Sequence, residues 1–225
     1  EEPDIVVAAV YPEEAVGLVN ALSPDRLFFS DACRSSYLIE HLGERAEGIR
    51  GTSLAPDPST GYAIAYEEIF GEAPPAFAAQ TYDAFLLALY TAARQEAAPG
   101  ESLAASIRWV VTGDGTVKGW DPEEAGEAMA LLRAGAHPAV TGASGPLRFG
   151  EHSSRGPLAG YYSIWAIEGG AFSEGNPVPS AAIDPYIPDL SFAGSAGDRP
   201  VVWMIYPLEK GDRSFADSAY RGLFR

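Results

Sequence analysis

The first 55 residues alternate apolar runs with stretches of helical periodicity. Apolar runs at residues 5–10, 27–30 and 49–54 are typical of buried strands. Between them, residues 12–22 and 35–46 repeat apolar side chains at the three-to-four spacing of amphipathic helices. Strands that alternate with helices at this spacing are joined by right-handed crossovers, so the pattern predicts an α/β fold with a parallel sheet.

The pattern changes at APDPST, residues 55–60, which has the composition of a linker. Helical periodicity then continues for about eighty residues, with capping signals such as Asp121 before Pro122. We expect helices at 62–70, 76–97, 101–111 and 121–135. The pattern shows no strand among them, so their apolar faces should pack on a sheet from another part of the chain or from another chain.

Strand signals return at residues 146–149 and 161–172. Within the second run, Glu168 precedes Gly169 and Gly170, and two glycines that accept positive φ are typical of a two-residue hairpin turn. The sequence therefore predicts that residues 161–172 form a hairpin.

The C-terminal part starts with a segment of low regularity. Residues 173–199 hold four prolines with Gly, Ser and Ala, which predicts an extended linker or a wrapping tail. Residues 201–206 are apolar and rich in β-formers, and a helix is expected from Ser214. Because an unpaired apolar strand invites aggregation, residues 201–206 should join a sheet, either beneath the helices of 60–135 or in a neighbouring chain as a swapped element.

Composition narrows the class of protein. The chain has 225 residues, 47% of them hydrophobic, with one cysteine and a net charge of −16. A chain of this size buries a sizeable core without disulfides, and its charge repels nucleic acid and anionic lipid. The longest apolar run, residues 84–93, is about half the ~20 residues of a bilayer span. The acidic start EEPD differs from a signal peptide, so we expect that any targeting peptide has been removed or was not included.

Motifs of catalysis and of metal binding are weak. Ser144 lies in GASG, which lacks the G-x-S-x-G spacing of a nucleophile elbow and precedes a strand. The histidines His41, His137 and His152 are far apart, and none has a partner at metal-ligand spacing. The sequence therefore predicts a protein without enzymatic activity, metal or cofactor.

Two strand ends carry the candidate binding residues. Tyr11 follows the first strand, and Ser30, Asp31 and Ala32 follow the second. Open α/β sheets bind ligands at the carboxyl ends of their strands. The Tyr11 ring could hold a cation by cation–π contact and Asp31 by a charge-assisted hydrogen bond, while Asp31 could equally serve as a helix N-cap. We expect Tyr11 and Asp31 to line one cleft.

Longer segments resemble a known family. FFSDACRSSYL, PPAFAAQTYDA, GASGPLRF and AGYYSIWAIEGGAF resemble, in order, the second half of the periplasmic solute-binding proteins of the branched-chain amino-acid type. That family has two α/β lobes, closes on a ligand between them, and delivers the ligand to an ABC transporter or acts as a receptor. The resemblance implies that residues 1–172 form the second lobe with helices that return to cover the first.

The resemblance also assigns roles to residues. An acidic residue that holds the ligand ammonium group matches Asp31, and an aromatic residue after the preceding strand matches Tyr11. The family's serines and threonines that receive the ligand carboxylate belong to the first lobe's sheet, which would precede Glu1. This departure leaves the expected contacts to the ligand carboxylate outside the sequence.

The tail resembles a second family. Residues 199–224, with the motif GDRSFADSAY, are similar to the opening strand and helix of the nucleoside-binding basic membrane lipoproteins. Asp212 and Phe215 would match a polar ligand contact and a base-stacking ring, whereas Ala216 replaces the usual asparagine. Residues 200–225 therefore look like the start of a second binding domain, or like a strand supplied to an incomplete lobe.

Together these observations predict an extracytoplasmic solute-binding protein for a small polar ligand, with an amino acid favoured. Its partners would be that ligand and an ABC transporter permease, and a strand-swapped homo-oligomer is an option. Its location would be periplasmic or extracellular, with a lipid anchor in the full-length protein as one variant. The alternatives are a ligand-free sensory or structural domain of the same fold, a nucleoside-binding lipoprotein and, third, a hydrolase.

Overall fold

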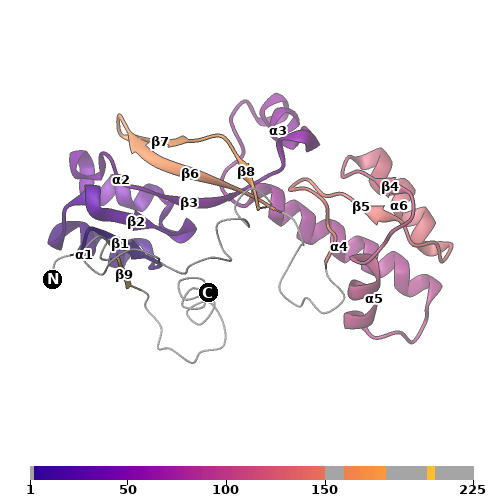
Figure 1. Cartoon of the computed structure of the whole chain (residues 1–225). Coiled ribbons are helices and arrows are strands. Elements are labelled where there is room, and N and C mark those ends of the chain that lie inside the picture. Colours follow the sequence, from indigo (N-terminus) through magenta and orange to yellow (C-terminus); the bar gives the residue numbers. More distant parts are fainter. Residues whose placement is uncertain (1–2, 150–159, 181–201, 206–225) are drawn as a thin grey trace, which may run out of the picture. The chain divides into compact units, whose positions relative to one another are not determined.

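The computed structural model describes residues 3–149, 160–180 and 202–205, which group into two compact units. Unit 1 comprises Glu1–Ser53 and Tyr162–Arg225, and unit 2 comprises Leu54–Tyr161. Unit 1 holds the main sheet, and unit 2 holds the two longest of the described helices (Figure 1). In the part of the chain that is described, no helix is both long and apolar enough to span a bilayer.

Unit 1 is built on a mixed sheet with the strand order β7-β6-β3-β2-β1-β9 (Figure 1). The pairs β1–β2, β2–β3 and β1–β9 are parallel, whereas β6 and β7 form an antiparallel hairpin, and β8 also pairs with β6. The strands are β1 (Ile5–Ala8), β2 (Leu27–Phe29), β3 (Arg50–Ala55), β6 (Tyr161–Glu168), β7 (Ala171–Glu174), β8 (Val178–Pro179) and β9 (Val202–Ile205). This architecture confirms the predicted α/β class with a parallel sheet.

The helices of unit 1 connect its parallel strands. They are α1 (Pro12–Ala21) and α2 (Ser36–Leu42), with 3₁₀ turns at Pro24–Arg26, Asp31–Cys33 and Gly43–Ala46. Pro12 occupies the first turn of α1, where a backbone N–H would have no helical partner. Val6, Leu27, Phe29 and Trp165 belong to one buried core. These elements confirm the strand and helix pattern expected for residues 5–55.

The predicted hairpin of unit 1 is confirmed. Glu168 pairs with Ala171, and Gly169 and Gly170 between them have φ of 61° and 77°. Two successive positive φ values match the right-handed twist of the strands, and glycine adopts them without a steric penalty. The second strand continues to Glu174, so β7 and β8 occupy the first residues of the segment that was expected to be an extended linker. The rest of that segment, 181–199, lies outside the described residues.

The tail strand joins a sheet, as expected, but not at the expected place. β9 pairs with β1 in parallel along its full length, with Ile5 opposite Val202 and Ala8 opposite Ile205. The position beneath the helices of 60–135 is therefore wrong, because β9 belongs to unit 1 of the same chain. β1 would otherwise be an unpaired sheet edge, and pairing with β9 removes that edge.

Unit 2 differs from expectation in having strands of its own. β4 (Val117–Lys118) and β5 (Ala139–Val140) form a small parallel sheet, which corrects the prediction that no strand accompanies these helices. Two-residue strands produce no alternation that a sequence pattern could reveal. Residues 146–149 were expected as a strand, but they form bridges and single backbone hydrogen bonds instead. Pro146, which has no N–H to donate, makes an isolated bridge to Thr141, while the N–H groups of Leu147 and Phe149 donate to Val140 and Val111.

The helices of unit 2 bury their apolar faces mainly against one another. α4 packs against both α5 and α6, and Leu86, Tyr90, Val110 and Leu132 lie in their common core. The helices are α3 (Tyr62–Phe70), α4 (Ala78–Ala97), α5 (Leu103–Val110) and α6 (Pro122–Arg133). A core of this kind needs no sheet from elsewhere, although several large apolar side chains of α3 and α4 remain exposed.

Candidate functional site

The ends of β1 and β2 lie side by side at the carboxyl edge of the sheet of unit 1. The Ser30 N–H donates to the carbonyl oxygen of Ala8 at 3.1 Å, and Ala8 stands opposite Phe29 in the strand register. Tyr11 follows β1 and Asp31 follows β2. Both residues therefore lie at the same edge of the sheet, after neighbouring strands.

Tyr11 stands at the entrance to α1. It is the N-cap residue of the helix, and its backbone N–H donates to Glu14 Oε2 at 3.1 Å. Its side chain is 59% exposed, so the ring is accessible to a solute.

Asp31 opens the 3₁₀ turn after β2, and Asp31 and Ala32 are both half-buried. Asp31 Oδ1 accepts the Ala32 N–H at 2.9 Å. The N-cap of α2 is Ser35, whose Oγ accepts the Tyr37 N–H, so the alternative in which Asp31 caps that helix is wrong. Ser30 precedes the turn, and in the described part of the chain its Oγ is buried without a hydrogen-bond partner. A carboxylate and an unused hydroxyl thus stand next to each other along the chain.

Sequence reasoning missed a charged cluster at this edge. Arg34 Nη2 lies 3.3 Å from Glu174 Oε2, and its guanidinium lies 5.5 Å from the centre of the Phe172 ring. Glu174 also accepts a hydrogen bond from the buried Ser163, with 2.7 Å between the oxygens. The Ile167 N–H, near the end of β6, donates to the carbonyl oxygen of Ile49, just before β3, so the end of β6 lies beside the start of β3. Because β7 is antiparallel to β6, β7 runs in the direction of β3, and Glu174 ends it toward the carboxyl edge of the parallel strands. The edge therefore carries both signs of charge.

The one cysteine has a structural role. Cys33 is fully buried, and its Sγ lies 3.1 Å from the Val10 carbonyl oxygen, to which the thiol donates. Burial raises the pKa of the Cys33 thiol to about 12. Because only the thiolate is a good nucleophile, Cys33 is not suited to catalysis, and it instead fastens the turn after β2 to the end of β1.

Ser144, the residue weighed as a nucleophile, is committed to a buried carboxylate in unit 2. Its N–H donates to Asp83 Oδ2 at 2.9 Å, and its hydroxyl donates to the same oxygen. Asp83 is only 3% exposed, and burial raises its pKa although the hydrogen bonds from Ser144 and Ala143 act in the opposite direction. Asp83 therefore anchors the loop of Ser144 to α4.

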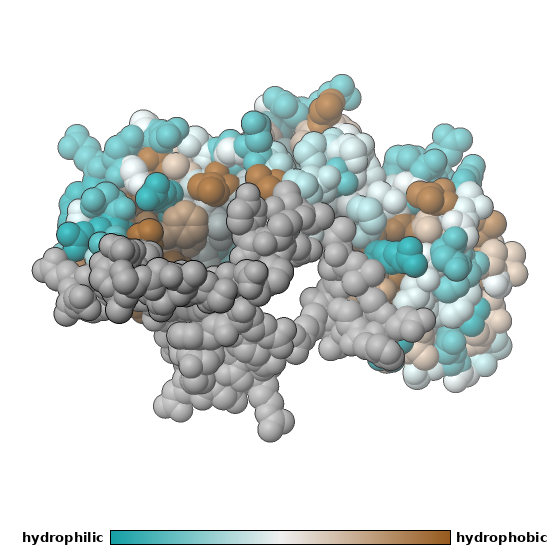
Figure 2. All heavy atoms as spheres, viewed as in Figure 1, coloured by the Kyte–Doolittle hydropathy of each residue, from teal (hydrophilic) through white to brown (hydrophobic). Residues whose placement is uncertain are grey.

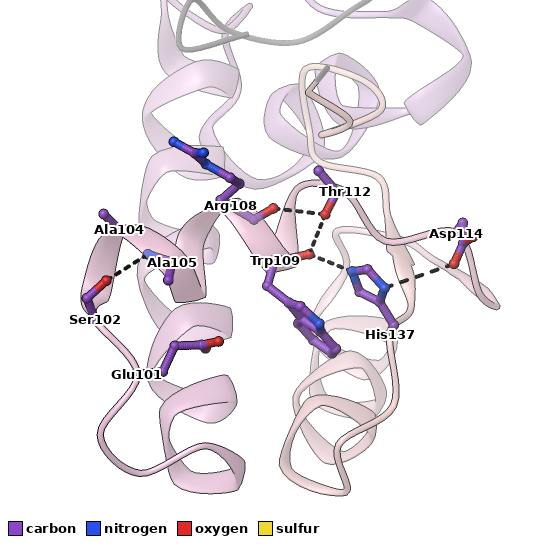
Figure 3. A pocket seen from close by; sticks show the side chains of 9 residues that line it. All are labelled: Glu101, Ser102, Ala104, Ala105, Arg108, Trp109, Thr112, Asp114 and His137. Atoms are coloured by element: carbon purple, nitrogen blue, oxygen red, sulfur yellow. Dashed lines mark hydrogen bonds and ion pairs between the residues drawn. The ribbon is translucent and has the colours of Figure 1, made fainter. Parts of the chain in front are cut away.

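One hollow of unit 2 lies beside α5 (Figure 3). Its volume is about 700 Å³, and Trp109 and His137 form part of its wall. The Trp109 ring already has two close neighbours: the His137 ring stacks on it at 4.0 Å, and the Arg94 guanidinium lies 4.0 Å from its centre. His137 Nε2 donates to the Trp109 carbonyl oxygen at 2.6 Å. The Trp109 ring is thus already engaged in contacts with two side chains of the same unit.

Metal-type side chains do not converge in the residues that the structure covers, where no three of His, Cys, Asp and Glu could hold an ion together. His41 lies on α2, where its ring stacks on Tyr37 at 3.7 Å, and His137 lies in unit 2. His152 falls outside the described residues. Asp212 and Phe215, the candidates in the tail, also lie outside them.

Comparisons with known proteins gave one likeness. No family model and no curated protein matches the sequence. A solved structure, the leucine-binding protein LivK of Thermotoga maritima, is similar with a TM-score of 0.45 and 21% sequence identity. The likeness covers 77% of this chain and 44% of that protein. The chain therefore spans less than half of the length of the protein that it resembles.

Proposed function

We propose that the chain is an extracytoplasmic solute-binding module that holds a small zwitterionic ligand, an amino acid, at the carboxyl edge of the unit 1 sheet. The observation that carries the proposal is the hydrogen bond from the Ser30 N–H to the Ala8 carbonyl oxygen. This bond keeps the residues after β1 and β2 at one edge, where open α/β sheets bind ligands.

The chemistry of that edge suits an ammonium group. The half-buried Asp31 carboxylate would accept a charge-assisted hydrogen bond, and the exposed Tyr11 ring would add a cation–π contact. The Ser30 hydroxyl and the Ala32 backbone adjoin Asp31 and complete the proposed ligand-binding set. The resemblance of the sequence to amino-acid-binding proteins supports the same role, and with it delivery of the ligand to an ABC transporter permease outside the cytoplasm.

The test is calorimetry with the twenty amino acids and with a nucleoside. We expect one amino acid or a related group of them to bind. Asp31→Ala should weaken that binding about ten- to 150-fold, which corresponds to the ~1.5–3 kcal/mol of a hydrogen bond to a charged group. The control is Asp25→Ala, which removes the same charge from the turn before β2, at the opposite end of the strand.

Three outcomes would contradict the proposal. Equal losses in the Asp31 and Asp25 variants would indicate a general charge effect. Binding of the nucleoside alone would favour the lipoprotein alternative. Absence of binding in the folded protein would favour a ligand-free sensory or structural domain.

A further inference from the structure

Unit 2 contains a groove whose wall is largely aromatic. It lies between α3, the start of α4 and the start of α6, and its volume is about 980 Å³. Its rings belong to Tyr62, Tyr66, Phe70, Tyr82, Phe85 and Trp120. This volume is at the upper end of the range of small-molecule pockets, about 300–1,000 Å³, and such pockets typically have apolar walls with a few polar groups.

The inner rings of the groove are fixed in place by one another. Tyr62 and Tyr82 each meet the Trp120 ring edge-on, with centres 5.3 and 5.8 Å apart. The Tyr82 hydroxyl donates to the Trp120 carbonyl oxygen at 3.1 Å, and the Trp120 indole N–H donates to Thr60 at 2.9 Å. Because these polar groups already have partners, the inner wall is formed before any ligand arrives.

The outer rim of the groove exposes apolar side chains to water. Phe70 is 63% exposed, Ile69 is 73% exposed and Phe85 is 64% exposed. Figure 2 shows hydrophobic side chains of α3 at the surface among hydrophilic ones. A ligand with an apolar body would remove this surface from water, which is favourable in proportion to the apolar area buried.

The charge of the groove selects among such ligands. Among the described residues that form its wall, Asp121 is the one with a formal charge, and its Oδ1 accepts the N–H groups of Glu123 and Glu124 as the cap of α6. The negative charge also affects Tyr82, whose pKa is raised chiefly by burial and further by the carboxylates of Asp121 and Asp83. Aromatic faces also attract cations, and a net charge of −16 repels anions.

We propose that this groove is a second binding site, which takes an organic cation of the arylalkyl-ammonium class. The apolar body of the ligand lies along the aromatic wall, and the ammonium group lies at the Asp121 carboxylate. The site belongs to unit 2 and is independent of the amino-acid site proposed in unit 1.

The experiment titrates the 225-residue chain with three probes that share a phenyl group: benzyltrimethylammonium, neutral 2-phenylethanol and anionic phenylacetate. Calorimetry should show the cation binding at least tenfold more tightly than the alcohol and the anion not binding. Asp121→Asn should reduce the affinity for the cation at least fivefold and leave the affinity for the alcohol unchanged. Asparagine is as good an N-cap as aspartate, so α6 should keep its stability.

The matched control is Glu123→Gln, which removes a charge from the same helix turn but not from the groove wall. A second variant, Tyr66→Leu, tests the aromatic wall and should lower the affinity for the cation more than the affinity for the alcohol. Equal affinity for cation and alcohol would overturn the proposal, as would equal losses in the Asp121 and Glu123 variants. A protein that binds none of the probes and forms a dimer that Phe70→Ser dissociates would show instead that the groove is an interface between two copies.

Discussion

Asp83 on α4 and Ser144, 61 residues further along the chain, are joined by a hydrogen bond of 2.9 Å from the Ser144 N–H to Asp83 Oδ2. The Ala143 N–H donates to the other oxygen of the same carboxylate. Gly142 completes the contact, because a Cβ built there would lie 2.2 Å from Asp83 Oδ1. The loop can approach α4 this closely only with glycine at that position.

Gly142→Ala should therefore destabilise the protein by several kcal/mol, because a methyl group would displace the buried carboxylate from its donors. Gly126→Ala is the matched substitution. Gly126 lies within α6 in open space, where an added methyl group would meet no neighbouring atom, so alanine should stabilise the helix by about 0.5–1 kcal/mol. Denaturant unfolding of both variants measures the difference, and a Gly142 variant as stable as the parent would contradict the role of this contact.

Asp83 should also contribute to the pH dependence of stability. Its pKa in the folded protein is raised above 3.8, chiefly by burial, so the folded state binds this proton more tightly than the unfolded state. The contribution of Asp83 to the free energy of unfolding is then greatest below pH 3.8 and falls as the pH rises through the raised pKa. An NMR titration of the Asp83 carboxyl carbon should give a midpoint above 3.8. A midpoint at or below 3.8 would be inconsistent with desolvation as the main effect.

Removal of two tyrosine hydroxyls of unit 2 should have different effects on the stability of the protein. Tyr90 is fully buried, and in the described residues its hydroxyl has no hydrogen-bond partner, whereas the Tyr82 hydroxyl donates to Trp120. Tyr90→Phe should leave stability unchanged or raise it by up to about 2 kcal/mol, while Tyr82→Phe should lower it by about 0.5–1.5 kcal/mol. Thermal unfolding of the two variants ranks them, and a larger loss for Tyr90→Phe would reveal a partner of that hydroxyl.

The pairing of β9 with β1 predicts the effect of truncation. A chain that ends after residue 198 loses β9 and should be destabilised by roughly 2–4 kcal/mol, since each backbone hydrogen bond contributes about 1 kcal/mol net. A chain that ends after residue 208 keeps β9 and serves as the control. Hydrogen exchange should show faster exchange in β1 of the shorter chain only. An unchanged melting temperature would mean that β9 adds nothing to unit 1.

The sequence predicted local structure better than long-range partners. The helix at 62–70 has the observed bounds because Gly61 and Gly71 flank it in left-handed conformations, with φ of 71° and 75°. In contrast, nothing local to residues 201–206 distinguishes β1 from any other edge as the partner of β9. Strand pairing between distant segments depends on which edges the rest of the fold leaves open, and periodicity does not contain that information.

Only part of the candidate site could be predicted from the sequence. The positions of Tyr11 and Asp31 follow from strand ends, which an apolar run marks clearly. Arg34 and Glu174 could not be paired in the same way, because they are 140 residues apart and Glu174 lay in a segment with the composition of a linker. Only the hairpin register brings its carboxylate to the guanidinium.

The return of β6, β7 and β9 to the sheet started by β1, β2 and β3 also imposes an order on biosynthesis. Unit 2 is continuous in sequence, Leu54–Tyr161, and its contacts can form as soon as that stretch leaves the ribosome. The sheet of unit 1 is complete only after residue 205 has been made, because β1 pairs with residues about 200 positions later in the chain. During translation the edge of β1 stays open, so a chaperone that covers exposed strands would act on the nascent first half of unit 1.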